Sequence, residues 1–498
     1  MALSYESTRG GQKGVTASQA ILKGLAEDGG LFMPTEIPKL DKTLEQLAGM
    51  TYQETAYEVM KLFLTDYTEE ELKSCIANAY DDKFDTEEIA PLAKADGAYF
   101  LELYHGSTIA FKDMALSILP HLMTTAAKKN HADKEIVILT ATSGDTGKAA
   151  MAGFADVPGT RIIVFYPKGG VSKIQELQMR TQKGDNTSVV AIHGNFDDAQ
   201  TGVKKLFGNK ELEKEMAEAG FQFSSANSIN IGRLVPQVVY YVYAYAKLLE
   251  NEQIENGEEI NVVVPTGNFG NILAAYFAKH MGVPIKTLIC ASNDNKVLYD
   301  FFKTGTYDRK REFILTSSPS MDILISSNLE RLLYKLSGNN ADTTKELMTA
   351  LKTVGKYEVS DEIKAEITSK FFGGFCNDEQ TKATIKALFD TDKYLCDTHT
   401  AVAVNVYEQY VEQTGDTTPS VIASTASPYK FSKAVLEAVS DGTDLPENEF
   451  DMVEKLFEVS NAPVPAPLAA LKDKKARFSD VTEVNSMPQY VLDALNIK

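Results

Sequence analysis

The sequence predicts an α/β protein built on parallel sheets, because its apolar runs, turns and helical patterns follow one another in a repeated order. From about residue 96 onward, short β-branched runs are each followed by a Gly/Ser-rich turn and a helical pattern. The clearest examples are EIVILTA before TSGDTG, RIIVFYP before KGG, and INVVVP before TGNFGN. Such units favour parallel sheets with right-handed crossovers. Ligands of these sheets bind beyond the carboxyl ends of the strands, where the turns lie.

The segment before the first such unit has a different pattern. Residues 1–95 contain SQAILKGLAEDGGLFMP, TLEQLAGM, TYQETAYEVMKLFL and TEEELKSCIANAY, whose apolar spacing is typical of amphipathic helices. A chain of 498 residues is too long for one ordinary core. We therefore expect a mostly helical N-terminal domain over 1–95, a first α/β domain over 96–235 and a second over 236–498. The second carries a helical insertion at about 338–395, which we expect to order when substrate binds.

Charge and composition argue against several classes of function. Asp and Glu number 69 against 50 Lys and Arg, which gives a net charge of −19. This field repels nucleic-acid backbones and anionic membranes, so we expect neither as a partner. The 4 cysteines form no C-x-x-C pair and no zinc spacing, so we expect reduced thiols and no metal site. The start of the chain has no apolar targeting segment, and no run of about 18 apolar residues occurs, so we expect a cytoplasmic protein.

Three turns at predicted strand ends are candidate ligand sites. PTGNFGN (265–271) follows a strand pattern and opens a helix, where free backbone N–H groups can bind a phosphate. A tight strand–helix connection is the alternative, and TSGDTG (142–147) and TASPYKF (425–431) taken singly fit helix caps equally well. PTGNFGN is not G-x-G-x-x-G, and TSGDTGKAA lacks the first Gly and the final Ser/Thr of a P-loop. These sites therefore lack the fingerprints of dinucleotide-binding folds and P-loop ATPases.

Lys112 has a sequence context that allows two interpretations. It stands between Phe111 and Asp113 in YHGSTIAFKDMAL (104–116), on a mostly apolar helical stretch. For a lysine taken alone, a solvated side chain beside its counter-ion is the simpler interpretation. The alternative is a buried amine, whose pKa falls from about 10.4 when burial and nearby cations disfavour its charge. Such an amine can act as a nucleophile toward a carbonyl group.

Taken together, these motifs carry a resemblance to a known family. In chain order they are STRG, GLAEDGGLFMP, HGSTIAFKD, TSGDTG, SSANSINIGRLVPQ, PTGNFGN, SPSMDILISSNLERLL and TASPYKF. The sequence resembles pyridoxal-phosphate (PLP) enzymes of the tryptophan-synthase-like fold, called fold type II. Within that group it is similar to the threonine synthase family, in the longer form with an extra N-terminal domain. The resemblance implies two parallel-sheet α/β domains with the cofactor between them.

The resemblance implies a role for each of the central motifs. Lys112 matches the family lysine that holds the cofactor aldehyde as a Schiff base. The cofactor phosphate is expected in the loop formed by Gly267, Asn268, Phe269, Gly270 and Asn271. Thr425 matches the hydroxyl that faces the pyridine nitrogen, which makes the ring a milder electron sink than a carboxylate would and suits elimination and replacement.

The resemblance also implies a reaction. It is the conversion of O-phospho-L-homoserine and water to L-threonine and phosphate by γ-elimination and β-replacement, the last step of threonine biosynthesis. Lys112 is expected to transfer the protons, because a mobile amine within about 3 Å of the reacting atoms can serve several steps.

The substrate-binding residues are less defined. The substrate phosphate needs a cationic pocket within a chain of charge −19, and an arginine can bind phosphate through two N–H groups. For Arg233 taken alone, a surface ion pair is an equally good interpretation. The first candidates, all in NSINIGR, are Asn227, Ser228, Asn230 and Arg233, and the second is Lys148.

The turn TSGDTG supplies the remaining candidates, Ser143, Asp145 and Thr146, for the substrate carboxylate or the cofactor rim. Asp145 departs from the wider fold group, where asparagine is common in this loop. A carboxylate beside the substrate carboxylate would be repulsive, so we expect Asp145 to contact another group.

Two alternatives stay open at this point. One is a sister activity on the same fold, a serine/threonine dehydratase or a β-replacement enzyme such as cysteine synthase. Those enzymes lack the GLAEDGGLF domain and the NSIN segment. The other is a non-catalytic homologue that binds a metabolite, which should have lost the lysine. The resemblance also leads us to expect a monomer.

Overall fold

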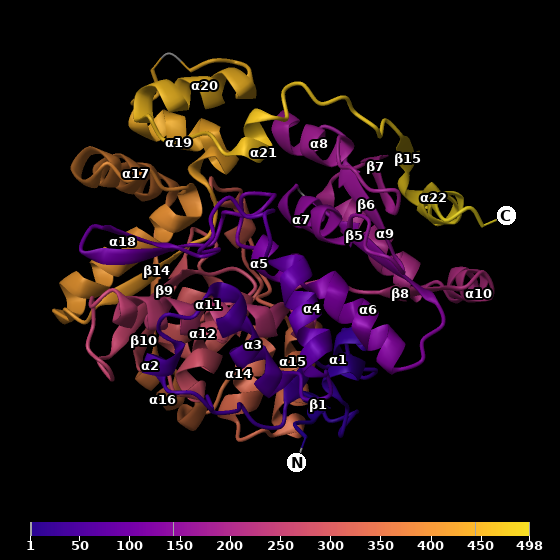
Figure 1. The fold of residues 1–498 in the computed structure, drawn as a ribbon, viewed down its shortest axis with the longest axis horizontal. Coiled ribbons are helices and arrows are strands. Elements are labelled where there is room, and N and C mark those ends of the chain that lie inside the picture. The colour runs from indigo at the N-terminus through magenta and orange to yellow at the C-terminus, as the bar shows by residue number, and fades with distance from the viewer. Residues whose placement is uncertain (1, 143, 444, 498) are drawn as a thin grey trace.

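The computed structural model describes residues 2–142, 144–443 and 445–497, which form two mainly parallel sheets (Figure 1). The larger sheet has the strand order β13-β10-β9-β14-β4-β3, in which the β3–β4 pair is antiparallel and the other pairs are parallel. Its strands are β3 (Leu92–Ala95), β4 (Ala98–Glu102), β9 (Ile260–Pro265), β10 (Ile285–Ser292), β13 (Phe371–Phe375) and β14 (Ser420–Ser424). The predicted parallel α/β architecture is confirmed.

The smaller sheet is parallel in its described pairs and has the order β15-β7-β6-β5-β8. Its strands are β5 (Glu135–Ala141), β6 (Thr160–Pro167), β7 (Thr187–His193), β8 (Phe221–Ser224) and β15 (Val481–Glu483). The helices that pack on these strands include α7 (Asp145–Phe154), α9 (Phe196–Gly208) and α10 (Lys210–Glu218). Helices α5 (Asp113–Leu116), α6 (Leu119–Lys129) and α8 (Lys173–Arg180) pack against α7.

The N-terminal region is mostly helical, as predicted, and each of its helices starts at a threonine. The four threonines Thr16, Thr43, Thr51 and Thr68 form capping boxes with a Gln or Glu three residues later. Each box satisfies two backbone N–H groups that a helix start leaves open. The elements are β1 (Tyr5–Ser7), α1 (Ala17–Lys23), β2 (Phe32–Pro34), α2 (Leu44–Leu47), α3 (Tyr52–Phe63) and α4 (Glu69–Ala79), and β1 pairs with β2.

The long helix α11 (Ile231–Glu250) lies at the centre of the molecule and joins the N-terminal region to the larger sheet. It packs against α3 on one side and against α12 (Gly270–Met281) on the other. Aromatic side chains fill the first contact, where the ring of Tyr52 meets those of Tyr80 and Tyr243 edge to face, at 5.1 Å in both pairs. Such contacts stabilise beyond area burial alone.

The remaining elements follow α12 along the chain. In chain order they are α13 (Val297–Thr304), β11 (Thr306–Asp308), the 3₁₀ turn η1 (Pro319–Met321), α14 (Leu329–Leu336), α15 (Ala341–Thr353), β12 (Lys356–Glu358), α16 (Asp361–Lys370), α17 (Asp378–Asp392), α18 (Thr398–Thr414), η2 (Pro428–Phe431), α19 (Ser432–Val439), α20 (Glu449–Ser460), α21 (Ala466–Ala469), η3 (Val484–Ser486) and α22 (Met487–Ala494).

The two sheets depart from the predicted ranges 1–95, 96–235 and 236–498. Strand β3 lies in the first of these ranges but belongs to the larger sheet. Strand β4 lies in the range 96–235 but pairs with β14 of the larger sheet, and β15 lies in the range 236–498 but pairs with β7 of the smaller sheet. Figure 1 shows the yellow C-terminal chain running from α21 to β15 at the edge of the smaller sheet. Long-range pairing of this kind leaves no periodic signal in the sequence. The predicted insertion at 338–395 also differs, because it contains β13, an edge strand of the larger sheet.

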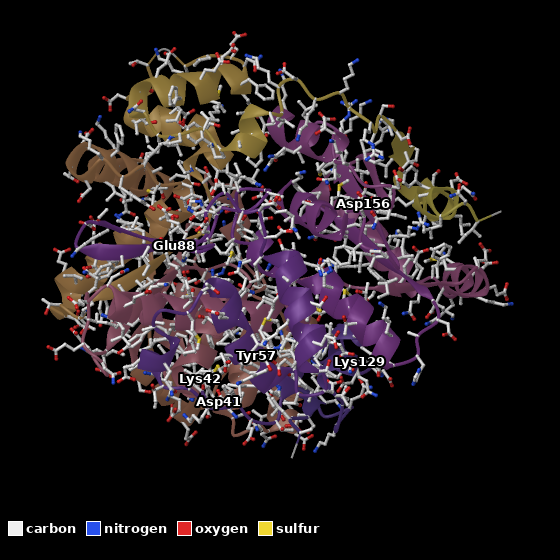
Figure 2. All side chains as sticks on the ribbon, viewed as in Figure 1. Asp41, Lys42, Tyr57, Glu88, Lys129 and Asp156 are labelled. Atoms are coloured by element: carbon white, nitrogen blue, oxygen red, sulfur yellow. The ribbon has the colours of Figure 1, made fainter. Side chains whose placement is uncertain are left out.

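The surface is rich in charged side chains, and the cysteines lie in the interior. Charged side chains lie around the molecule, among them Lys129, which pairs with Glu71 at 2.8 Å (Figure 2). All 4 cysteines are buried and free. Among the described residues, no helix has the length and apolar character needed to cross a membrane, and no group of three or more His, Cys, Asp or Glu side chains is placed to hold a metal ion.

Candidate active site

Lys112 stands at the N-cap of α5, in a segment tied to the end of β14. The Phe111 N–H donates to the Thr425 carbonyl at 2.8 Å, and the Ser427 N–H donates to the Ile109 carbonyl at 3.0 Å. At the first residue of α5, the Asp113 carboxylate accepts hydrogen bonds from the Thr108 hydroxyl and backbone N–H at 2.6 and 2.8 Å. The backbone around Lys112 is therefore fixed on both sides.

The Lys112 amine lies in a buried polar cluster. Its Nζ donates to the Ser320 Oγ at 3.3 Å and lies 4.0 Å from the Asp145 Oδ2. Burial lowers the pKa of Lys112; the Asp145 charge opposes this effect, while Lys430 and Arg233 lower the pKa further. More of the amine is therefore neutral near neutral pH than in an exposed lysine, and the neutral form is the nucleophile.

Asp145 contacts cationic and hydrogen-bonding side chains of this protein. That it does not contact the substrate carboxylate stays a prediction. Its Oδ1 accepts from the Gln175 Nε2 at 3.0 Å and lies 3.4 Å from the Lys430 Nζ, while its Oδ2 accepts from the Ser320 Oγ at 3.3 Å. Burial alone would raise the pKa of Asp145, but the charges of Lys430 and Lys112 hold it well below its usual range. Asp145 is therefore ionised and balances both lysines.

The glycine-rich loop joins β9 to α12 and lies against the same cluster. A Cβ atom at Gly267 would lie 2.6 Å from the Ser320 carbonyl oxygen, so only glycine fits there. Phe269 is the N-cap of α12 with a left-handed φ of 65°. The buried Asn271 Nδ2 has no hydrogen-bond partner among the described residues. An open donor at the start of a 12-residue helix is suited to an anion such as a phosphate.

Thr425 directly follows β14 and is buried. Its backbone N–H donates to the Thr400 Oγ1 at 3.3 Å, and its carbonyl accepts from Phe111, the neighbour of Lys112. The structure therefore brings together three of the predicted features, which are Lys112, the 267–271 loop and Thr425.

The predicted substrate-binding residues divide into two groups. Arg233 is buried with its Nη1 donating to the Ala226 carbonyl at 2.8 Å, and its Nε has no partner among the described residues. Burial lowers the pKa of Arg233 to about 10, and its charge reaches Lys112. Asn230 is a correction, because its side chain caps α11 and bonds the Ile21 and Ser225 carbonyls.

The other candidates are not placed at the amine. Asn227 is exposed, Ser228 and Thr146 are partly exposed, and no contact with Lys112 is recorded for them within the described ranges. Ser143 lies outside the described residues. Lys148 is on α7, and burial together with Lys430 and Lys474 lowers its pKa to about 7.

Sequence reasoning missed four side chains of the cluster, namely Gln175, Ser320, His399 and Lys430. Two of them lie inside quoted motifs, Ser320 in SPSMDILISS and Lys430 in TASPYKF, so the signal was present but had no assigned chemistry. His399 lies in CDTHTAVA, where an Asp before a helix indicates an N-cap.

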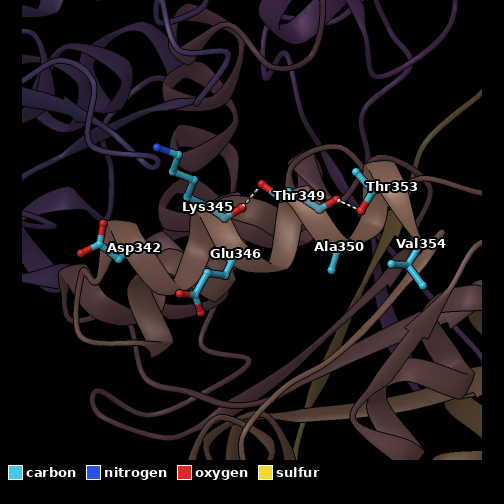
Figure 3. A pocket seen from close by; sticks show the side chains of 7 residues that line it. All are labelled: Asp342, Lys345, Glu346, Thr349, Ala350, Thr353 and Val354. Atoms are coloured by element: carbon cyan, nitrogen blue, oxygen red, sulfur yellow. Dashed lines mark hydrogen bonds between the residues drawn. The ribbon is translucent and has the colours of Figure 1, made fainter.

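A separate hollow lies on the surface along α15 (Figure 3). It is lined by Asp342, Lys345, Glu346, Thr349, Ala350, Thr353 and Val354. These come from one helix and the residue after it, and they include none of the side chains around Lys112. The hollow is therefore not part of the candidate site.

Comparison with known proteins matches the chain along most of its length. Family models match for "Threonine synthase N terminus" over 4–80, "Pyridoxal-phosphate dependent enzyme" over 85–425 and "Threonine synthase, C-terminal" over 400–491. Human "Threonine synthase-like 1" is 39% identical over 434 residues, covering 85% of this chain. The chain spans only 58% of that relative's length.

Two further matches cover most of this chain and most of the matched protein. The threonine synthase of Schizosaccharomyces pombe is 36% identical, over 89% of this chain and 90% of its own. The crystal structure of a PLP-bound threonine synthase from Brucella melitensis superimposes with a TM-score of 0.87 at 36% identity, over 99% of both chains.

Proposed function

Because this chain belongs to the threonine synthase family of pyridoxal-phosphate-dependent enzymes, we propose that it converts O-phospho-L-homoserine and water to L-threonine and phosphate. The enzyme is then a carbon–oxygen lyase that acts on a phosphate ester. The observation that carries the proposal is the buried Lys112 amine with a lowered pKa, placed in one cluster with the glycine-rich start of α12.

The residues of the cluster fit pyridoxal phosphate. Lys112 offers the amine for its aldehyde, the N-terminus of α12 with the open Asn271 Nδ2 offers donors for its phosphate, and Thr425 offers a hydroxyl for its ring nitrogen. When bound, the cofactor supplies an electron-withdrawing ring that makes the α-proton of an amino acid acidic. A threonine hydroxyl, unlike a carboxylate, does not hold the ring nitrogen protonated, which suits elimination and replacement.

The chain's own residues then move the protons and hold the substrate. Burial lowers the pKa of the Lys112 amine, so more of it is neutral than in an exposed lysine and can take the α-proton and return it at later steps. Asp145 and Lys430 fix the local charge around this amine. The Arg233 guanidinium, with its open Nε, and the nearby Lys148 are the cations we propose for the substrate phosphate.

We propose that the protein acts as a cytoplasmic monomer with small-molecule partners only. The net charge of −19 supports the absence of a nucleic-acid partner. Size-exclusion chromatography with light scattering tests the monomer, and a dimer mass would overturn it.

The test of the function is threonine formation from O-phosphohomoserine by the purified, PLP-loaded protein, with Lys112→Ala alongside. We expect threonine and equimolar phosphate from the wild type and a loss of at least about 10³-fold in the variant, because the amine acts in several steps. A PLP-loaded wild type that makes no threonine but releases keto acid from serine or threonine would assign the dehydratase reaction instead.

A further inference from the structure

Asp397 and His399 form a buried pair at the start of α18, outside the predicted site. The Asp397 Oδ2 lies 2.8 Å from the His399 Nδ1, and the two side chains are 0% and 5% exposed. The same carboxylate accepts the backbone N–H groups of His399 and Thr400 at 2.9 and 3.1 Å, and also the Thr400 hydroxyl. A carboxylate surrounded by donors can only accept, so the proton of the neutral imidazole is on Nδ1.

The other ring nitrogen of His399 is consequently an acceptor. Its Nε2 accepts the backbone N–H of Ser320 at 3.1 Å. The Phe431 ring lies against the imidazole, with the ring centres 4.8 Å apart, and restricts its rotation. His399 therefore offers one fixed lone pair to one backbone group of the turn η1 (Pro319–Met321).

Ser320 connects this pair to the candidate active site. Its hydroxyl bridges the Lys112 Nζ and the Asp145 Oδ2, each at 3.3 Å, and its carbonyl oxygen lies against Gly267. Farther along, the Ser326 hydroxyl donates to the Gly267 carbonyl at 2.7 Å and the Asn328 Nδ2 to the Asn268 carbonyl at 3.0 Å. The segment 318–328, here called the strap, thus crosses the glycine-rich loop.

The same carboxylate also reaches the other side of the site. The Thr400 hydroxyl, which donates to Asp397, accepts the Thr425 backbone N–H at 3.3 Å. The Thr425 carbonyl in turn accepts the N–H of Phe111, next to Lys112. One buried side chain therefore supports both the strap and the backbone that carries the lysine.

We propose that His399, oriented by Asp397, is a positioning residue that holds the Ser320 hydroxyl between Lys112 and Asp145. The inference rests on the proposed function only in taking Lys112 as the amine that binds the cofactor. A cap on α18 by Asp397 alone would not require an imidazole two residues later, nor its second nitrogen at the strap.

The experiment compares His399→Leu, which removes the acceptor, with His399→Gln, whose amide oxygen can take the place of Nε2. The matched control is Val402→Ala, a truncation at a fully buried position on the same helix. The first readout is hydrogen–deuterium exchange of short peptides from the strap in the cofactor-free protein. The second is the dissociation constant of PLP with the visible absorption spectrum of the loaded protein. Neither uses O-phosphohomoserine, so both are independent of the proposed substrate.

We expect His399→Leu to speed exchange of the peptide containing Ser320 and to weaken PLP binding, each by about 5- to 10-fold, the effect of losing one net hydrogen bond. His399→Gln should recover most of both, and Val402→Ala should lower the melting temperature with neither effect. Unchanged exchange and PLP affinity in His399→Leu would overturn the proposal. So would equal defects in the Leu and Gln variants, since the acceptor would then not matter.

Asp397→Asn tests the orientation of the ring without changing His399. Each oxygen of the Asp397 carboxylate accepts two hydrogen bonds, one oxygen from His399 and the other from Thr400. The N–H₂ group of an asparagine would therefore face hydrogen-bond donors whichever way the amide is turned. Turned toward His399, it drives the ring proton to Nε2, against the Ser320 N–H. We expect this folded variant to match His399→Leu in strap exchange, and wild-type exchange would count against the orienting role.

Discussion

The charge on the Lys112 amine depends on a small number of neighbouring side chains. Burial and the cations Lys430 and Arg233 lower its pKa, whereas Asp145 raises it. Asp145 itself stays ionised because it is paired with the same lysines. The pKa of the Lys112 amine is therefore set by a balance of several charges and not by one residue.

Replacing Asp145 by asparagine should shift this balance in a known direction. The variant removes the carboxylate charge that raises the pKa of Lys112 most, so this pKa falls further. The rate at which cofactor-free protein recombines with PLP, measured across pH, should then reach its midpoint at a lower pH than in the wild type. Asp441→Asn, at an exposed pair with Lys386, is the control and should leave the midpoint in place. A midpoint that stays or rises would contradict the assigned role of Asp145.

Lys148 links a titration to stability. Its pKa is about 7 in the folded protein and about 10.4 in an unfolded chain, so between these values the unfolded chain binds more protons. The free energy of unfolding therefore rises with pH over this window, and the cost of the buried charge is fully present below pH 7. Lys148→Met removes this cost, so its stabilisation in urea unfolding should be larger at pH 6 than at pH 9.5. Equal effects at both pH values would show that Lys148 is not desolvated.

At the scale of elements, the position of Lys112 is set by close packing between short helices. Gly153 on α7 faces the end of α5, the helix that begins just after Lys112. A Cβ atom at Gly153 would lie 2.1 Å from the Leu116 carbonyl oxygen. The two helices can approach this closely only because the position is glycine.

Gly153→Ala should therefore displace α5 and the lysine with it. Overpacking costs roughly 1–3 kcal/mol, against a gain of up to about 1 kcal/mol in helix propensity, so we expect a net loss of about 1–2 kcal/mol in urea unfolding and weaker PLP binding. The control is Gly208→Ala at the end of α9, where a Cβ atom meets nothing within 4 Å. It should be neutral or stabilising. A Gly153→Ala protein as stable as the wild type, with unchanged PLP affinity, would refute the packing argument.

At the scale of the whole molecule, the N-terminal region is joined to the site through α14. Arg9 binds the buried Glu330 through two bonds of 2.8 Å, and Thr8 donates to the same carboxylate at 2.6 Å. The next residue, Arg331, donates to the Phe32 carbonyl at 3.0 Å and is fully buried. Because α14 follows directly after the strap, these bonds connect the N-terminal region to the helix that leads out of the strap.

A double-mutant cycle on Arg9 and Glu330 measures this connection. Arg9→Met leaves the Glu330 carboxylate buried without its cation, so we expect a loss of about 2 kcal/mol in the free energy of unfolding. Adding Glu330→Gln removes the unpaired charge and should recover about half of that loss. Strictly additive effects in urea unfolding would show that the pair does not couple the two regions.

The predicted site features that the structure brings together are local ones, which depend on neighbours along the chain. The turn before α12 and Thr425 each directly follow a strand, Lys112 lies at the start of α5, and the structure places these features together. In NSINIGR, Asn230 was assigned wrongly to substrate binding, because a helix cap and a ligand-binding residue use the same polar side chain.

By itself, the sequence determined the parallel α/β class and the helical N-terminal region, because strand and helix periods and capping boxes are local properties. Only the tertiary structure decided what surrounds the Lys112 amine. Ser320 meets Asp145 across 175 residues of chain, His399 meets Ser320 across 79, and β15 joins a sheet whose other strands lie far before it. Such contacts arise when packed layers bring distant segments together, and no periodicity along the chain records which segments will meet.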